Sequence, residues 1–392
     1  MKTRSPSPQI CFLQERYAPA VHEAIMREGS SRGWKMRFCY RRNAMLPTPE
    51  ETDGLLLLIG TDECRQWVAS THCPAVRVLC EDAGKAMPSV LFDQAEQGRQ
   101  GALHLLDQGF RNFAFLRVWD GPVSLLMRDG FESTVRAAGG LVHRFDLPSQ
   151  APPADYNTLP KSIREQYIAQ LLAALPVPLG VMVSADLFAA DIVYTARECG
   201  FAIPKDIAVI APENFASDLA YAPISITALD SDVQSVARHA CDLLARQLAG
   251  ERLDPNICLR VPPRRVVIRD STTTFISSSP AFAEAVLYLR RHFRDKIYVD
   301  DLAKRAGMSE RRFQEEFRQA LGRTVRDELM RLRLDLAQHL MHESGLTVAA
   351  IALESGFGDK ANLYRALARH RPASLPEDAL KDEADRESDS DD

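Results

Sequence analysis

Short apolar runs alternate with helical stretches along most of this 392-residue chain, and no other feature constrains its fold more strongly. The run at residues 54–60, GLLLLIG, is apolar throughout, as expected for a strand covered on both faces. A helical stretch follows at residues 64–70, and the strand–helix order then recurs up to residue 269. Because this order is typical of parallel strands joined by crossover helices, we predict an α/β fold with doubly wound parallel sheets.

The alternation ends with a predicted strand pair at residues 257–269, which Pro262-Pro263 interrupts. The segment 270–280, DSTTTFISSSP, has the composition of a linker, and no strand pattern follows it. We therefore predict five parts, which are a tail at 1–9, the α/β domain at 10–269, the linker at 270–280, an all-α domain at 281–375 and an acidic disordered tail at 376–392.

Residues 300–321, DDLAKRAGMSERRFQEEFRQAL, are predicted to form two short helices joined by a tight turn. Gly307 can take the left-handed conformation that ends the first helix, and Ser309 is a suitable N-cap for the second. Phe313 and Phe317 share one face, and long hydrogen-bonding side chains occupy the other. This pattern suits a helix that docks in the major groove of DNA, but a solvated helical hairpin explains these residues equally well.

The same pattern recurs at residues 346–370, where a short helix is predicted to end at Gly356, 49 residues after Gly307. A longer helix at residues 324–341 joins the two hairpins. A rigid joining helix would hold two reading helices about one turn of DNA apart, roughly 34 Å. The repeat therefore favours a bipartite DNA-binding domain.

The net charge of −5 argues against a nucleic-acid partner until its distribution is considered. The last twelve residues, KDEADRESDSDD, contain seven carboxylates and two basic side chains. Residues 281–375 instead contain 17 Lys and Arg against 13 Asp and Glu, a net charge of +4. The predicted DNA-binding segment is thus modestly basic, which supports that interpretation.

Composition and motifs exclude several other classes. The longest apolar run, residues 55–59, is too short to cross a bilayer, and the N-terminus lacks the apolar region of a signal peptide. The eight cysteines form no C-x-x-C pair, so we expect them to be reduced in a cytoplasmic protein. No P-loop, nucleophile-elbow, dinucleotide or zinc-protease motif is present, and the nine histidines have no partner at metal-ligand spacing.

The adjacent carboxylates Glu81-Asp82 and Asp382-Glu383 are best explained as solvated surface. We therefore expect no catalytic residue, metal or cofactor. An enzyme fused to a DNA-binding domain remains a rival hypothesis for which the sequence offers no motif.

Ligands of parallel sheets bind at the carboxyl ends of the strands, and polar side chains follow several predicted strands here. The candidates for a sugar are Asp93, Trp119, Arg128, Asp186, Glu213 and Asn214. Asp93 and Asp186 could instead cap the helices that follow them, and Trp119 could anchor a loop. Glu213-Asn214 has no capping pattern and is the strongest candidate.

Both parts of the chain also resemble known families. Residues 281–371 resemble the DNA-binding domain of AraC/XylS regulators through DDLAKRAGMSERRFQEEFRQALGRT, RLRLDLAQHLM and LTVAAIALESGF. Residues 10–272 resemble the periplasmic-binding-protein-like domain of the LacI family, without its DNA-binding headpiece. The matching stretches there are LFDQAEQGRQGALHLLDQGFRNFAFL, GVMVSADLFAADIVYTARECGFAIPKDIAVIAPEN and VPPRRVVIRDST. The resemblance implies a two-lobed effector domain followed by a double helix-turn-helix domain.

The resemblance also implies residue roles in DNA binding. The family's base-contact positions correspond to Arg311, Gln314, Glu315, Lys360, Ala361 and Arg365. Their neighbours Ser309 and Arg312, at the first reading helix, complete the predicted set of DNA-binding residues. Arginine forms bidentate pairs with guanine and glutamine with adenine, whereas alanine offers only a methyl contact. The first reading helix is therefore expected to supply most of the base reading.

Several positions depart from the family patterns. Ala185 replaces a sugar-binding Asn, Arg128 is shifted by one position, and Ala211-Pro212-Glu213 replaces a Gly-x-Asp loop. We expect a ligand other than the family's standard pentose, or weakened ligand control. After Leu367 the family's usual ending is replaced by RHRPASLPEDA, so the second hairpin is expected to dock less well or to bind mainly the DNA backbone.

These inferences together predict a transcription regulator, an activator of a carbohydrate-utilisation operon, that acts as a homodimer in the bacterial cytoplasm. Its expected partners are double-stranded operator DNA, a sugar or sugar derivative that closes the two lobes, and RNA polymerase. The alternative is a ligand-independent regulator or scaffold that keeps the fold but has lost the sugar site.

Overall fold

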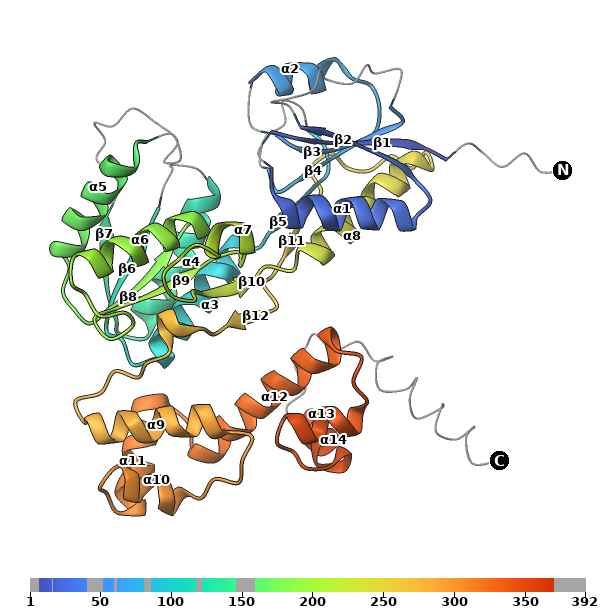
Figure 1. Ribbon diagram of the computed structural model, residues 1–392. Helices are drawn as coiled ribbons and strands as arrows, with labels where there is room; N and C mark the ends of the chain where they lie inside the picture. The colour runs from blue at the N-terminus through green and yellow to red at the C-terminus, as the bar shows by residue number, and fades with distance from the viewer. Residues whose placement is uncertain are drawn as a thin grey trace, which may run out of the picture. The chain divides into compact units, whose positions relative to one another are not determined.

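The computed structural model describes residues 7–15, 17–40, 52–59, 62–80, 86–117, 122–145 and 159–369 (Figure 1). Two compact units, Met1–Thr274 and Phe275–Asp392, divide the chain. Each unit is considered by itself below. None of the described helices is long and apolar enough to cross a membrane.

The first lobe of the first unit is built on a six-stranded parallel sheet with the order β11-β5-β4-β3-β1-β2. Its strands are β1 (Gln9–Gln14), β2 (Lys35–Tyr40), β3 (Gly54–Leu58), β4 (Ala75–Val78), β5 (Ser89–Phe92) and β11 (Cys258–Val261). Helices α1 (Pro19–Ser31) and α8 (Val233–Leu248) bury apolar residues on one face, and α2 (Asp62–Ser70) covers the other (Figure 1). Coverage of both faces explains why strands such as β3 are apolar throughout.

The second lobe repeats this arrangement with the order β12-β10-β9-β8-β6-β7. Its strands are β6 (Asn112–Leu116), β7 (Leu141–Phe145), β8 (Leu179–Val183), β9 (Ile207–Ala211), β10 (Thr227–Asp230) and β12 (Arg265–Val267). Its helices are α3 (Gln94–Asp107), α4 (Pro122–Ala137), α5 (Lys161–Ala173), α6 (Asp186–Glu198) and α7 (Ala216–Leu219). All neighbouring strands are parallel except β10 and β12. The predicted doubly wound α/β fold is therefore confirmed.

Two glycines let α3 and α4 approach each other closely. A Cβ atom added at Gly98 would lie 1.9 Å from the Met127 carbonyl oxygen, and one at Gly130 would lie 2.1 Å from the Ala95 carbonyl oxygen. Because no side chain fits at such distances, the packing of these two helices requires glycine at both positions.

The prediction of a strand pair at residues 257–269 is wrong. β11 pairs with β5 in the first lobe, whereas β12 pairs with β10 in the second. Pro262-Pro263 lies between them and cannot donate ladder hydrogen bonds, so the two prolines mark a crossing from one sheet to the other.

The predicted linker at 270–280 does not form a separate stretch. Its first residues form the short 3₁₀ helix η3 (Asp270–Thr272), in which Ser271 and Thr272 are fully buried. The Thr272 hydroxyl lies 2.7 Å from His104 Nε2 on α3. These polar residues look like a linker in sequence because their hydrogen-bond partners lie far away along the chain.

The described part of the second unit is entirely helical, as predicted. Its helices are α9 (Pro280–His292), α10 (Val299–Arg305), α11 (Glu310–Leu321), α12 (Val325–Glu343), α13 (Val348–Glu354) and α14 (Lys360–Arg369). One apolar core forms around Phe282, Phe313 and Phe317, and another around Leu334 and Leu363. Since α12 contributes side chains to both cores, it joins the two hairpins rigidly (Figure 1).

The turn and capping predictions for the two hairpins are confirmed. Gly307 and Gly356 adopt the left-handed conformation, with φ of +65° and +81°. The Ser309 hydroxyl accepts a hydrogen bond from the Arg312 backbone N–H and so caps α11. The predicted acidic tail at 376–392 lies outside the described residues.

A buried carboxylate connects three segments of the first hairpin's core. Glu328 on α12 is fully buried and forms ion pairs with Arg290 of α9 (3.1 Å), Arg323 (2.6 Å) and Arg331 (2.9 Å). Burial alone would raise the pKa of Glu328, but the guanidinium groups outweigh it and lower this pKa from 4.5 to about 2.

Replacing this carboxylate should destabilise the second unit strongly. In Glu328→Gln three guanidinium groups lose the buried carboxylate that they share, and breaking such a cluster costs about 3–5 kcal/mol. The pKa shift adds a pH dependence, because the unfolded chain binds the Glu328 proton first as the pH falls. The stabilisation is present above pH 4.5 and is lost progressively as the pH falls toward 2. Calorimetry of the whole chain at several pH values measures both effects.

Glu315→Gln is the matched control, because Glu315 pairs with Arg311 at a largely exposed position on α11. Its free energy of unfolding should change by less than about 1 kcal/mol. Equal destabilisation by the two variants would contradict the role assigned to Glu328.

Candidate effector site and nucleic-acid interface

The loop after β9 is held by a carboxylate from the neighbouring strand–helix connection. Asp186 is fully buried, and its two oxygens accept hydrogen bonds from the backbone N–H groups of Glu213 (2.9 Å) and Phe215 (2.6 Å). The N-cap of α6 is Ala185, so the interpretation of Asp186 as a helix cap is wrong. Its side chain points to the adjacent loop because two unpaired N–H groups are available there.

The surroundings of Asp186 disfavour its charged form. Burial, followed by the charge of Glu213, raises the pKa of Asp186 well above 3.8, and the two N–H donors oppose this shift. Asp186 therefore shapes the loop that carries Glu213 and Asn214 and is not itself exposed to solvent.

Two buried polar side chains hold the same loop from the other side. Gln97 of α3 donates to the Pro212 carbonyl (3.0 Å) and to the Ser231 hydroxyl (2.8 Å). Ser231 donates to the same carbonyl at 2.8 Å. The sequence analysis missed Gln97 and Ser231, because neither lies directly beside the loop in sequence.

Asn214 connects the loop to the end of the second lobe. It has a left-handed backbone, with φ of +62°, which Asn tolerates better than most residues. Its side-chain oxygen accepts a hydrogen bond from Arg269 at 2.7 Å, and Arg269 also donates to the Ile226 carbonyl at 2.6 Å. Because Arg269 directly precedes η3, the candidate loop is bonded to the last structured turn of the first unit.

The remaining predicted effector contacts are engaged locally or are not described. Asp93 caps α3 by accepting from the Glu96 backbone N–H at 3.1 Å, which confirms its capping interpretation. Arg128 pairs with Asp129 at 3.0 Å on α4. Trp119 lies outside the described residues, as do Glu81 and Asp82. The structure thus brings together Asp186, Glu213 and Asn214.

The structure adds a residue to the candidate effector site that the sequence analysis overlooked. Gln14 ends β1 and is fully buried, yet neither atom of its amide group has a hydrogen-bond partner within the described residues. Leaving such a group unsatisfied costs about 1–3 kcal/mol. Gln14 lies at the carboxyl edge of the first sheet, where ligands of such folds bind, so its amide group is a candidate ligand contact. Its signal in sequence is a polar residue that ends an otherwise apolar strand.

The outer face of α11 presents the side chains predicted to read DNA. The Arg311 side chain is 89% exposed and donates to Glu315 at 3.0 Å, while Gln314 donates to Glu310 at 2.9 Å. Phe313 and Phe317 on the opposite face are fully buried. The helix is therefore fixed by its apolar face and free to present its polar face to a partner.

The second reading helix, α14, is also firmly docked. Leu363 and Leu367 are buried, while Lys360, Ala361 and Arg365 are exposed. α14 therefore packs firmly within its own domain, whereas the expectation that the second hairpin docks less well on DNA stays a prediction. The altered stretch from residue 370 onward lies outside the described residues.

Comparisons with known proteins match both units. Residues 102–272 match the periplasmic binding protein-like domain family, and residues 302–375 match a helix-turn-helix domain family. The chain joins a periplasmic binding protein-like domain to a helix-turn-helix domain. Its binding-protein domain contains the two lobes, and its helix-turn-helix domain contains the two hairpins.

The relatives are transcription regulators rather than enzymes. The xylose operon regulatory protein of Escherichia coli strain K12 is 25% identical over 197 residues, half of each chain. The transcriptional activator RhaS of Citrobacter koseri is 32% identical over 95 residues, 24% of this chain and 34% of RhaS. The match thus spans about half the length of the first of these curated relatives and about a third of the second.

A solved structure of the xylose-binding transcription activator XylR shares the fold, with a TM-score of 0.59 and 19% identity. The superposition covers 96% of this chain and 98% of that chain. The predicted order, a binding-protein-like domain followed by helix-turn-helix hairpins, is therefore confirmed, and XylR shares this fold.

Removing the Asp186 carboxylate should loosen the loop after β9. In Asp186→Ala the N–H groups of Glu213 and Phe215 lose their acceptors, at about 1–3 kcal/mol for each buried group left unsatisfied. Amide hydrogen exchange in a peptide that spans residues 212–220 should become at least tenfold faster.

Asp206→Ala provides the matched comparison, because Asp206 accepts a backbone N–H from Ala202 at 2.8 Å in the turn before β9. Its effect should remain at residues 202–206. Unchanged exchange at 212–220 in Asp186→Ala would show that the loop does not depend on this carboxylate.

Proposed function

We propose that this protein is a transcription regulator in which a sugar or sugar derivative bound by the binding-protein domain controls DNA binding by the helix-turn-helix domain. The observation that carries this proposal is the hydrogen bond between Asn214 and Arg269. It links the candidate effector loop to the turn that leads into the DNA-binding unit. Ligand control of such a protein is a coupling free energy between its two sites, and a bond at this position contributes to that coupling in our proposal.

The DNA-reading part of the proposal rests on α11. Its exposed Arg311 and Gln314 have the side chains that pair with guanine and adenine in the major groove. Two copies of the chain would place such helices on two operator half-sites. In this proposal the protein acts as a homodimer in the bacterial cytoplasm, and it activates a carbohydrate-utilisation operon through contact with RNA polymerase.

The effector part rests on polar groups at the carboxyl edges of both sheets. Gln14 offers an amide that has no partner among the described residues of the first lobe, and Glu213 and Asn214 lie on the loop after β9 in the second. Carboxylate and amide groups suit the hydroxyls of a sugar. The matched relative from Escherichia coli regulates a xylose operon, but Ala185 and Pro212-Glu213 depart from the expected contacts. We therefore favour a sugar other than xylose.

Control would follow from a shift between open and closed arrangements of the two lobes. A ligand that contacts Asn214 competes for, or reorients, the amide oxygen that Arg269 binds. Arg269 also holds the Ile226 carbonyl just before β10, so a change there reaches η3 and the sheet together.

A ligand-independent regulator or scaffold is the second candidate. It is favoured by the loop after β9, whose backbone N–H and carbonyl groups are bonded to Asp186, Gln97 and Ser231. A screen for ligand binding separates the two candidates.

A thermal-shift screen with a broad panel of sugars tests the effector site. A sugar at one hundred times its Kd stabilises the folded state by about 2.7 kcal/mol. Gln14→Leu should be at least as stable as the parent without ligand, because it removes a buried unsatisfied amide, and should lose most of the stabilisation by the sugar. Gln170→Leu, which changes an exposed amide on α5, should respond as the parent does. If no sugar stabilises the parent, the ligand-independent candidate is correct.

Arg269→Met tests the coupling. The variant should bind the active sugar within about threefold of the parent affinity, and it should bind DNA from upstream of its own gene. The sugar-dependent change in DNA affinity, expected to be about 5- to 150-fold in the parent, should disappear. Titrations by fluorescence anisotropy measure both affinities. Arg252→Met, at an exposed position between α8 and β11, should keep the full response, and a full response in Arg269→Met would reject the connection.

A further inference from the structure

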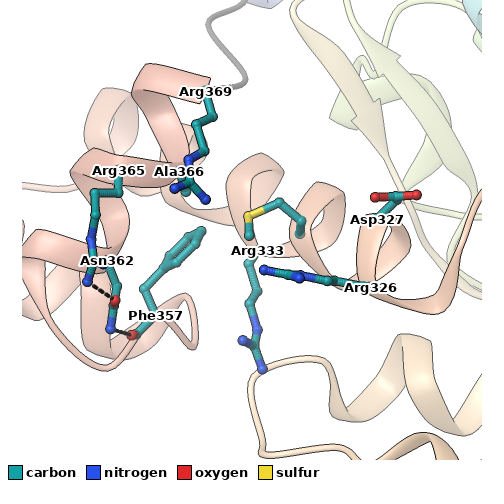
Figure 2. Close-up of a pocket in the computed structure, with 9 residues that line it drawn as sticks. Arg326, Asp327, Arg333, Phe357, Asn362, Arg365, Ala366 and Arg369 are labelled. Atoms are coloured by element: carbon teal, nitrogen blue, oxygen red, sulfur yellow. Dashed lines mark hydrogen bonds between the residues drawn. The ribbon is translucent and has the colours of Figure 1, made fainter.

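A hollow of about 510 Å³ lies between α12 and α14 in the helix-turn-helix domain. Four arginines line it, with Arg326 and Arg333 on α12 and Arg365 and Arg369 on α14 (Figure 2). None of the predicted DNA contacts except Arg365 belongs to this set. The sequence hides the cluster, because its two pairs are separated by more than thirty residues.

The hollow has little negative charge to balance these arginines. Asp327 is the one carboxylate among its lining residues. The Asp327 carboxylate accepts hydrogen bonds from the Thr324 N–H (3.1 Å) and hydroxyl (2.7 Å) as part of the capping box of α12. In Figure 2 it lies well apart from the guanidinium group of Arg365.

These arginines differ from others in the same domain. Arg290, Arg323 and Arg331 all pair with Glu328, whereas within the described residues none of the four arginines of the hollow forms an ion pair. Where these four arginines have hydrogen-bond partners among the described residues, the partners are neutral groups.

Arg333 donates to the carbonyls of Phe293 (2.7 Å) and Asp295 (2.8 Å), and Arg365 donates to the side chain of Asn362 (2.7 Å). Four like charges around one concave surface repel one another and create a positive potential there. An anion in the hollow would relieve this repulsion.

We propose that this hollow binds a phosphate group of the DNA backbone. The guanidinium fork matches the geometry of phosphate oxygens and forms paired, charge-assisted hydrogen bonds with them. Met330, Phe357 and Ala366 add an apolar part to the lining, which suits the face of a deoxyribose next to the phosphate. A free inorganic phosphate would use the arginines but not this apolar surface.

The inference rests on the proposed DNA binding and divides the work between the two hairpins. Phosphate contacts hold a protein on the duplex without reading its sequence, whereas base contacts specify the sequence. Ala361 stands at a predicted base-contact position of α14 and offers only a methyl group. The second hairpin would therefore clamp the backbone while α11 reads bases with Arg311 and Gln314.

Salt dependence of DNA binding tests this division of work. The double variant Arg326→Gln/Arg369→Gln changes two exposed side chains and leaves the better-bonded Arg333 and Arg365 in place. It should bind DNA from upstream of its own gene and an unrelated duplex of equal length about tenfold more weakly, by the same factor for both. The slope of log K against log salt concentration should fall in magnitude by about 1–2.

Two further variants serve as comparisons. Arg311→Ala should reduce the preference for the upstream DNA over the unrelated duplex, because it removes a base contact. Arg238→Gln, on α8 of the binding-protein domain, removes one positive charge elsewhere and should change neither slope nor preference. The single variants Arg326→Gln and Arg369→Gln, each compared with the parent by circular dichroism, repeat the test if the double variant does not fold.

The outcomes separate this inference from the proposed function. If the parent binds neither duplex, the proposed DNA binding fails and the clamp fails with it. If the parent binds DNA and the arginine variants keep its full salt slope, the clamp alone is overturned. A further measurement then identifies the ligand of the hollow. If millimolar inorganic phosphate stabilises the parent but not the double variant, the hollow binds a small anion instead of the DNA backbone.

Discussion

The helix-turn-helix domain is organised around one buried negative charge. Glu328 draws α9, the turn before α12 and α12 itself into a single cluster, because each supplies a guanidinium group that pairs with this buried carboxylate. The aromatic core of Phe282, Phe313 and Phe317 packs beside this cluster and fixes α11. The orientation of the first reading helix thus depends on a charge that never reaches the surface.

A comparable arrangement in the binding-protein domain acts on a loop instead of a helix. Asp186, Gln97 and Ser231 satisfy the backbone after β9 from different elements, and Arg269 ties the same loop to η3. Each bond is ordinary in strength, but together they join the carboxyl edge of the sheet to the point where the chain leaves the domain. Structure and proposed regulation therefore depend on the same few polar contacts.

The sequence predicted those features that depend on neighbouring residues. Strand and helix alternation gave the α/β class, and the glycines at 307 and 356 with Ser309 gave the two hairpins. The sequence was misleading where the pairing partner of a segment lies far away along the chain. Residues 257–269 look like one strand pair, but their two strands find partners in different sheets.

The candidate sites show the same division. Glu213 and Asn214 could be selected from their position after a strand, whereas the direction of the Asp186 side chain could not, because it depends on two N–H groups 27 and 29 residues away. Arg269 and the arginines between α12 and α14 have no local signal, and Gln14 has only its place as a polar residue that ends an apolar strand. Their significance comes from burial, from a bond across the domain and from a concave surface, which only the folded chain displays.

The sharing of α12 by both hairpin cores has a consequence for the DNA itself. One continuous helix, α12, fixes the distance and the rotation between α11 and α14. The two helices therefore cannot rotate relative to each other to match a different spacing of their contact sites along the DNA. One base pair inserted between the segments that the two hairpins contact would rotate one of them by roughly 34° around the duplex axis. Under the proposed function, the DNA sites of this protein are therefore expected to tolerate changes in base sequence better than changes in spacing.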